Sequence, residues 1–121
     1  MFRSKAMALA LTLALSVCFA GAAVAAQGTI KIGVAGAHSG NLAGYGTGTL
    51  NATKIIAEKV NAAGGIAGGK MIEIVAQDEQ CKHELASNVA SKIISDDIKV
   101  VIGHICTGAT RAALPLYTEA K

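Results

Sequence analysis

The feature that most constrains the fold is an alternation between two apolar periodicities along the chain after residue 28. Segments in which every second residue is apolar are typical of strands, and segments with apolar residues three and four apart are typical of helices. Here a strand pattern is followed by a helix pattern three times in succession. Strands separated by helices of this length predict right-handed crossovers and a parallel sheet. We therefore expect an α/β fold with an open, doubly wound parallel sheet.

The expected boundaries follow from where each pattern starts and stops. The first loop is expected to run from Ala37 to about Gly48, and Gly64 and Gly65 supply the left-handed residues that end a helix. The third strand is a continuous apolar run, typical of a central strand covered on both faces. Pro115 is expected to break or kink the last helix, because proline has no N–H to donate. The expected strands are 29–36, 70–77 and 98–102, and the expected helices are 48–63, 85–96 and a third from Thr107 onward.

The first residues carry the pattern of an export signal. Arg3 and Lys5 precede an almost wholly apolar run over residues 6–20, and small residues follow that run. This order of charge, apolar run and small residues is typical of a cleavable secretory signal peptide. Residues 1–26 are therefore predicted to be the signal peptide and residues 27–121 the mature domain. The predicted cleavage motif is Ala23-Val24-Ala25 or Val24-Ala25-Ala26.

A membrane anchor is the competing interpretation of the same apolar run, since a stretch of about 20 apolar residues can span a bilayer. It is disfavoured because the run is rich in alanine and ends in small residues without a cluster of stop-transfer charges. We expect export to the periplasm, with no stable membrane insertion after the signal is cleaved.

The charge balance argues against a nucleic-acid partner. The whole chain has 11 Lys and Arg against 8 Asp and Glu. Two of the basic residues, Arg3 and Lys5, belong to the predicted signal, so the mature part is close to neutral. It has no run of basic residues of the kind that binds nucleic acid or anionic lipid.

Patterns typical of nucleotide-dependent or hydrolytic enzymes fail here. The stretch from Gly64 to Lys70 approaches a phosphate-binding loop, but Met71 replaces the Ser or Thr that would coordinate magnesium, and the stretch leads from helix to strand. A dinucleotide-binding pattern at Gly44 and Gly46 has Thr49 where the last glycine should be. No serine-nucleophile pattern is found. The sequence therefore predicts neither an enzyme nor a cofactor.

Thr107 is the leading candidate for ligand binding. Ligands of open parallel sheets bind beyond the carboxyl ends of the strands, near helix N-termini that favour anions. Two loops meet this condition, at residues 36–48 and 103–110. In the second loop Thr107 falls at the expected N-cap, where its hydroxyl and nearby N–H groups could hold a carboxylate. The alternative is that Thr107 only caps its own helix.

Two interpretations remain open for the cysteines of the mature part. Cys81 and Cys106 each follow a predicted strand, and an even pair in an oxidising compartment favours a disulfide. The alternative is a zinc site in which His83 and His104 join the two thiolates, a ligand set that suits zinc. The spacing of one residue between cysteine and histidine departs from the usual zinc patterns.

Several segments together resemble the start of the Leu/Ile/Val-binding proteins of ABC transporters. The similarity runs in order through the whole mature chain without large gaps. The segments that carry it are Ile30-Lys31-Ile32-Gly33-Val34, Ser39-Gly40, Tyr45-Gly46, Asn61-Ala62-Ala63-Gly64-Gly65-Ile66, Asp78, Cys81, Ile102-Gly103-His104, Cys106 and Pro115-Leu116-Tyr117.

This resemblance implies a type I periplasmic binding fold, in which two Rossmann-like α/β lobes close on a small ligand. The ligand would be a branched-chain amino acid, and the partner a membrane permease driven by cytoplasmic ATPases. The resemblance further implies that Thr107 holds the ligand α-carboxylate, that Tyr45 lines the side-chain pocket, and that Cys81 and Cys106 form the family disulfide.

The length of the chain departs from the family pattern. Family members are much longer, and this sequence stops at Lys121, where a fourth strand would be expected. The second lobe, and the acidic group that would accept the ligand ammonium, are not in this sequence. We therefore expect an incomplete N-terminal lobe, a truncated product in which ligand binding would be impaired.

Overall fold

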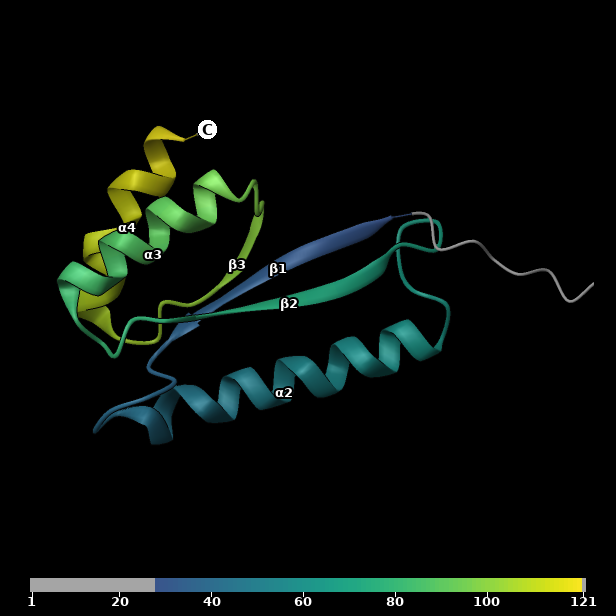
Figure 1. The fold of residues 1–121 in the computed structure, drawn as a ribbon, viewed down its shortest axis with the longest axis horizontal. Helices are drawn as coiled ribbons and strands as arrows, with labels where there is room; N and C mark the ends of the chain where they lie inside the picture. Colours follow the sequence, from purple (N-terminus) through teal and green to yellow (C-terminus); the bar gives the residue numbers. More distant parts are fainter. Residues whose placement is uncertain (1–27, 121) are drawn as a thin grey trace, which may run out of the picture.

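The computed structural model describes residues 28–120, which form a parallel sheet with helices on both faces (Figure 1). The predicted signal peptide therefore lies outside the described residues. Strands and helices alternate strictly, as the sequence predicts. In chain order they are β1 (Thr29–Gly36), α2 (Ala43–Ala62), β2 (Met71–Asp78), α3 (His83–Ser95), β3 (Val100–Ile102) and α4 (Thr107–Glu119).

The sheet has the order β2-β1-β3, and both pairings are parallel. β1 and β2 are paired over their full length, from Thr29 opposite Met71 to Gly36 opposite Asp78. Because the register is flush, the two strands end side by side at their carboxyl ends. The predicted α/β fold with a parallel sheet is confirmed.

The prediction for the third strand was wrong in one respect. β3 is an edge strand in the described part of the chain, and the side chains of Val100 and Ile102 are 46% and 38% exposed. The central strand is β1, which ends in a run of four buried residues. A continuous apolar run shows that a strand can be covered on both faces, but it does not say which neighbours pair with it.

The helices form two layers. α2 covers one face of β1 and β2, while α3 lies against the other face with α4 packed beside it (Figure 1). The main hydrophobic cluster lies on the α3 side of the sheet. Gly33 leaves room there for Ile93, whose side chain would touch any β-carbon at that position. The buried members of the cluster are Ala35, Val89, Ile93 and Ile98, and Val75, Val101 and Tyr117 pack against them.

Two helix boundaries differ from the predicted ones. α2 begins at Ala43, earlier than the predicted start at Gly48, because glycines in its first turns weaken the helical signal. α4 continues through Pro115 to Glu119, so the proline does not break the helix, one of the two outcomes predicted for it. Pro115 is exposed, where the carbonyl left without a helical partner can be solvated by water.

The end of α2 is tied to the sheet by one side chain. Asn61 donates from its amide nitrogen to the C=O of Ile72 (2.8 Å) and accepts from the N–H of Ile72 (2.7 Å). Gly64 and Gly65 then adopt positive φ, and the N–H of Gly65 bonds back to the C=O of Val60 (2.9 Å). The predicted glycine stop is confirmed.

Two glycines of α2 should respond in opposite ways to the same substitution. A β-carbon at Gly46 would collide with the backbone of Ala37, whereas one at Gly48 would meet open space. We expect Gly46→Ala to lower the free energy of unfolding by about 2 kcal/mol. Gly48→Ala should raise it by about 0.5–1 kcal/mol, because alanine loses less backbone entropy in a helix. Urea unfolding followed by circular dichroism checks both, and equal effects would contradict the close approach of α2 to Ala37.

Candidate functional site

Three loops converge at the carboxyl edge of the sheet, where the sequence predicted two. Residues 37–42 follow β1, residues 79–82 follow β2, and residues 103–106 follow β3. The loop after β2 is the one that was not predicted as part of the site. Glu79 in this loop and Asp78 at the end of β2 each contact a neighbouring loop.

Thr107 is the first residue of α4, and its side chain is exposed. The N-cap is Cys106, one residue earlier than the predicted cap, and no side chain bonds to the open end of the helix. The alternative in which the Thr107 hydroxyl caps its own helix is therefore not supported. Thr107 borders a cavity of about 460 Å³ lined also by His83, Gly108, Arg111 and Ala112.

Tyr45 lies in the first turn of α2, whereas Thr107 is the first residue of α4. Its N–H bonds to the C=O of Leu42 (3.0 Å), and its side chain is 69% exposed. It is not among the residues that line the cavity beside Thr107. The roles of Tyr45 and Thr107 in ligand binding therefore stay predictions.

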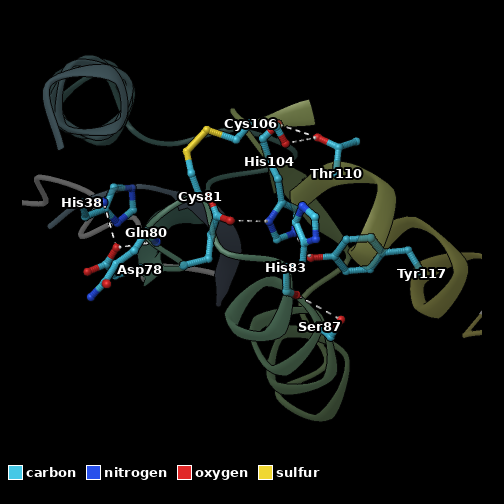
Figure 2. A network of polar contacts seen from close by, with 11 residues as sticks. His38, Asp78, Gln80, Cys81, His83, Ser87, His104, Cys106, Thr110 and Tyr117 are labelled. Atoms are coloured by element: carbon cyan, nitrogen blue, oxygen red, sulfur yellow. Dashed lines mark hydrogen bonds and ion pairs between the residues drawn. A yellow bond between two sulfur atoms is a disulfide. The ribbon is translucent and has the colours of Figure 1, made fainter. Parts of the chain in front are cut away.

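Cys81 and Cys106 form a disulfide, with their Cα atoms 5.4 Å apart (Figure 2). The bond joins the loop after β2 to the residue that precedes α4. The zinc interpretation was wrong, because both sulfur atoms are used in this bond. Among residues 28–120, no group of three or more His, Cys, Asp or Glu side chains could hold a metal ion.

Asp78 holds the loop after β1. Its Oδ1 accepts from the N–H of His38 (2.9 Å) and of Gln80 (3.2 Å), and its Oδ2 accepts from the hydroxyl of Ser39. Burial alone would raise the pKa of Asp78, but these hydrogen bonds stabilise the carboxylate and hold the pKa below its usual value. The bonds fix the start of the segment that leads to Tyr45.

Behind the disulfide lies a buried acid and base. Glu79 is fully buried and His104 is 8% exposed, and the Glu79 Oε2 lies 3.8 Å from the His104 Nδ1. The other ring nitrogen, Nε2, lies 3.1 Å from the hydroxyl oxygen of Tyr117 on α4 (Figure 2). Burial raises the pKa of Glu79 and lowers the pKa of His104, since it disfavours the charged form of each.

Comparison with protein families identifies this arrangement. Residues 29–121 match a family model described as periplasmic binding protein, which covers nearly all of the described chain. The chain belongs to the periplasmic binding protein family. The resemblance inferred from the sequence is thereby confirmed.

Two similar proteins are named for branched-chain amino acids. The Leu/Ile/Val-binding protein of Escherichia coli strain K12 is 40% identical over 90 residues, which is 74% of this chain and 24% of that protein. A branched-chain amino acid transporter substrate binding protein from Streptococcus pneumoniae, solved in complex with isoleucine, is 39% identical with a TM-score of 0.69. The match covers 76% of this chain and 26% of that structure.

One solved relative holds a different kind of ligand. It is an ABC transporter solute binding protein from Rhodopseudomonas palustris in complex with 3,4-dihydroxy benzoic acid, 30% identical with a TM-score of 0.67. The match covers 75% of this chain and 24% of that structure. These relatives are binding proteins by name, and this periplasmic binding protein chain spans about a quarter of their length. No helix within residues 28–120 is long and apolar enough to cross a membrane.

Sequence reasoning placed the disulfide of this family member correctly but missed its polar contacts. Asp78 was noted only within the family resemblance, and Glu79 was not singled out. A signal was available, because Glu79 precedes Cys81 by the same spacing with which His104 precedes Cys106. Because the disulfide brings the two cysteines together, the residues two positions before them are candidates for a contact.

Acid should weaken the anchor at Asp78. Because its pKa in the folded chain lies below the unfolded value of 3.8, the stabilisation is fully present above pH 3.8 and is lost as the pH falls through the folded value. We expect Asp78→Asn, which cannot ionise, to be less stable than the wild type at pH 7, and the difference to shrink near about pH 2.5. Thermal unfolding at both pH values measures this.

A second variant tests the cause of that pH dependence. Ser39→Ala removes the hydroxyl that bonds to Asp78, so the acid-induced loss should begin at a higher pH than in the wild type. If the wild type and Asp78→Asn lose stability in parallel over the whole range, Asp78 does not anchor the loop through its charge.

Proposed function

We propose that this chain is the first part of the N-terminal lobe of a periplasmic substrate-binding protein for an ABC importer, and that its ligand is a branched-chain amino acid. The observation that carries the proposal is the start of α4, where Thr107 is exposed and no side chain caps the helix. It lies at the sheet edge on which ligands of this fold class bind. The named relatives at about 40% identity support the same ligand class.

The start of α4 has the chemistry to bind the α-carboxylate of an amino acid. The first N–H groups of a helix have no partner within the helix, and the helix dipole favours an anion there. The Thr107 hydroxyl adds one donor at the same place. In the cavity beside it the guanidinium of Arg111 adds a positive charge, and His83 packs against Gly108.

The aliphatic side chain of the ligand would lie against the loop after β1. Tyr45 presents a largely exposed ring from the first turn of α2, which suits an apolar contact made when a second wall closes over the ligand. The bilobed fold of the family would supply that wall, together with an acidic acceptor for the ligand ammonium. The residues of this chain supply one wall of such a cleft.

The same proposal names the compartment and the partner. Residues 1–26 would direct export, the mature chain would act in the periplasm, and the oxidised disulfide is consistent with that compartment. A liganded substrate-binding protein of an ABC importer delivers its cargo to a membrane permease, so we infer a permease as the partner.

Calorimetric titration of the oxidised chain with leucine, isoleucine and valine tests the ligand class. We expect saturable but weak binding, since this chain supplies one wall of the cleft. The comparison ligand is 3,4-dihydroxybenzoate, because it shares the carboxylate but not the aliphatic side chain. Tighter binding of dihydroxybenzoate would replace the amino-acid assignment by an aromatic acid. No binding of either ligand by a folded, oxidised chain would contradict a receptor role for this chain and leave its family membership intact.

A matched pair of variants tests the role of Thr107. Thr107→Ala removes the hydroxyl, and we expect affinity to fall roughly tenfold or more, since a hydrogen bond to a charged group contributes about 1.5–3 kcal/mol. Thr107→Ser keeps the hydroxyl and should bind within a few fold of the wild type. Equal affinities for the alanine and serine variants would mean that the hydroxyl does not contact the ligand.

A further inference from the structure

Glu79 and His104 face each other in the interior, and each lies two residues before a cysteine of the disulfide. The same two loops are thus joined twice, once by the covalent bond and once by an acid and a base. Their burial is extreme for such groups, at 0% and 8% exposure. Ionisable side chains are rarely so deeply buried without a partner.

Three buried polar atoms of Glu79 and His104 make no hydrogen bond with any described residue. Within the described part of the chain, both carboxyl oxygens of Glu79 and the Nδ1 of His104 lack a hydrogen-bond partner. Two of these atoms, the Oε2 of Glu79 and the Nδ1 of His104, lie 3.8 Å apart. An ionised Glu79 beside a neutral imidazole would be a buried uncompensated charge, which costs several kcal/mol. A proton between the two atoms removes that cost.

We propose that Glu79 is held as a neutral carboxylic acid whose proton points toward Nδ1 of His104, and that this contact, beside the disulfide, positions the start of α4. The proton assignment completes the chain of contacts. With Nδ1 as acceptor, the neutral ring carries its proton on Nε2 and donates to the Tyr117 hydroxyl oxygen 3.1 Å away. Glu79, His104 and Tyr117 then link the end of β2 to the third turn of α4.

The surroundings favour this protonation state. Burial raises the pKa of Glu79 most. The N–H of Cys81 nearby lowers it, although this N–H does not reach hydrogen-bond geometry, and the negative charge of Asp78 raises it. Burial alone lowers the pKa of His104. The groups that face the pair are Asp78 from β2 and Tyr117 from α4, and burial raises the pKa of Tyr117, which keeps its hydroxyl neutral. The carboxylic acid and the neutral imidazole are therefore the favoured forms.

The contact between Glu79 and His104 lies where it can fix the position of Thr107. The C=O of His104 accepts from the hydroxyl of Thr110 (2.8 Å), which also lies 3.1 Å from the C=O of Cys106. His104 thus connects the buried pair to the first turn of α4 through its own backbone. That Thr107 then contacts a ligand rests on the proposed function, but the protonation and the position of α4 do not.

Nuclear magnetic resonance of the oxidised wild-type chain tests the protonation directly. At pH 6 an ordinary glutamate is ionised, whereas we expect the carboxyl carbon of Glu79 to show the shift of a protonated acid. The ring nitrogens of His104 should show one protonated and one unprotonated nitrogen. An ionised Glu79 at this pH, or a His104 protonated on both nitrogens, would overturn the proposal. Neither readout needs a ligand, so the result is independent of the proposed function.

A set of variants tests the consequence for stability. Because the pKa of Glu79 is raised in the folded chain, its contribution is fully present below the unfolded value of 4.5 and is lost as the pH rises through the folded value. Glu79→Gln keeps a donor but cannot ionise. It should therefore fold, and its stability should not fall as the pH rises through the folded pKa of Glu79. Glu79→Leu removes the donor and should be less stable than Glu79→Gln at every pH. Glu84→Gln, an exposed change in the first turn of α3, is the control for loss of one negative charge.

The position of α4 is read from the backbone amide resonances of Thr107 and Gly108. Both should keep their wild-type positions in Glu79→Gln and shift in Glu79→Leu, and the shift should grow when the disulfide is reduced. If Glu79→Gln and Glu79→Leu behave alike in stability, pH profile and amide resonances, Glu79 only fills space in the interior and the proposal fails.

Discussion

The pairing of β1 with a parallel strand on each edge is the constraint on which the rest of this structure depends. Parallel strands that start together also end together, so the flush register from Thr29–Met71 to Gly36–Asp78 delivers two loops to one edge of the sheet. β3 adds the third loop beside β1. The backbone N–H of Glu79 bonds to the C=O of Gly36 (3.0 Å), which continues the ladder past the last strand residue. Every candidate functional residue lies beyond this edge.

The loops at this edge are held by three different kinds of bond. Asp78 holds the loop after β1 through charge-assisted hydrogen bonds, which are stronger than neutral ones. The Cys81–Cys106 disulfide joins the loops after β2 and β3 and restricts the unfolded chain. Glu79 and His104 join the same two loops from the interior. A site built from loops gains precision when such supports fix them on a rigid scaffold.

Membership of the periplasmic binding protein family gives these supports a functional meaning. A protein that closes on a ligand keeps each wall rigid while the walls move relative to one another. The contacts of Asp78, the disulfide and the Glu79–His104 pair all lie within one wall. Under the proposed function, the start of α4, which no side chain caps, would present N–H donors to an anion. Selection among carboxylate ligands would then depend on the apolar contacts that surround the ligand side chain.

The sequence alone determined the local elements and their order. Alternating Ile30, Ile32 and Val34 predicted a strand, and Gly64 and Gly65 predicted the end of a helix, because these signals depend on neighbours close along the chain. The sequence favoured the pairing of Cys81 with Cys106, because no other cysteine remains after the predicted signal, but it left a zinc site as the alternative. The start of α2 was misplaced because glycine lowers helix propensity, whereas packing against Ala37 requires glycine at Gly46.

Only the tertiary structure decided which strand is central and which polar residues meet. An apolar run such as Val100–Ile102 does not reveal its neighbours, because strand order depends on contacts between segments far apart in the sequence. Glu79 and His104 are separated by a whole crossover, and neither residue type is expected in a core. Their burial arises because the register of β1 with β2 and the disulfide place both residues on the inner side of the same two loops. Periodicity along a sequence reports local geometry, and a contact made across a sheet is set by the packing of the whole lobe.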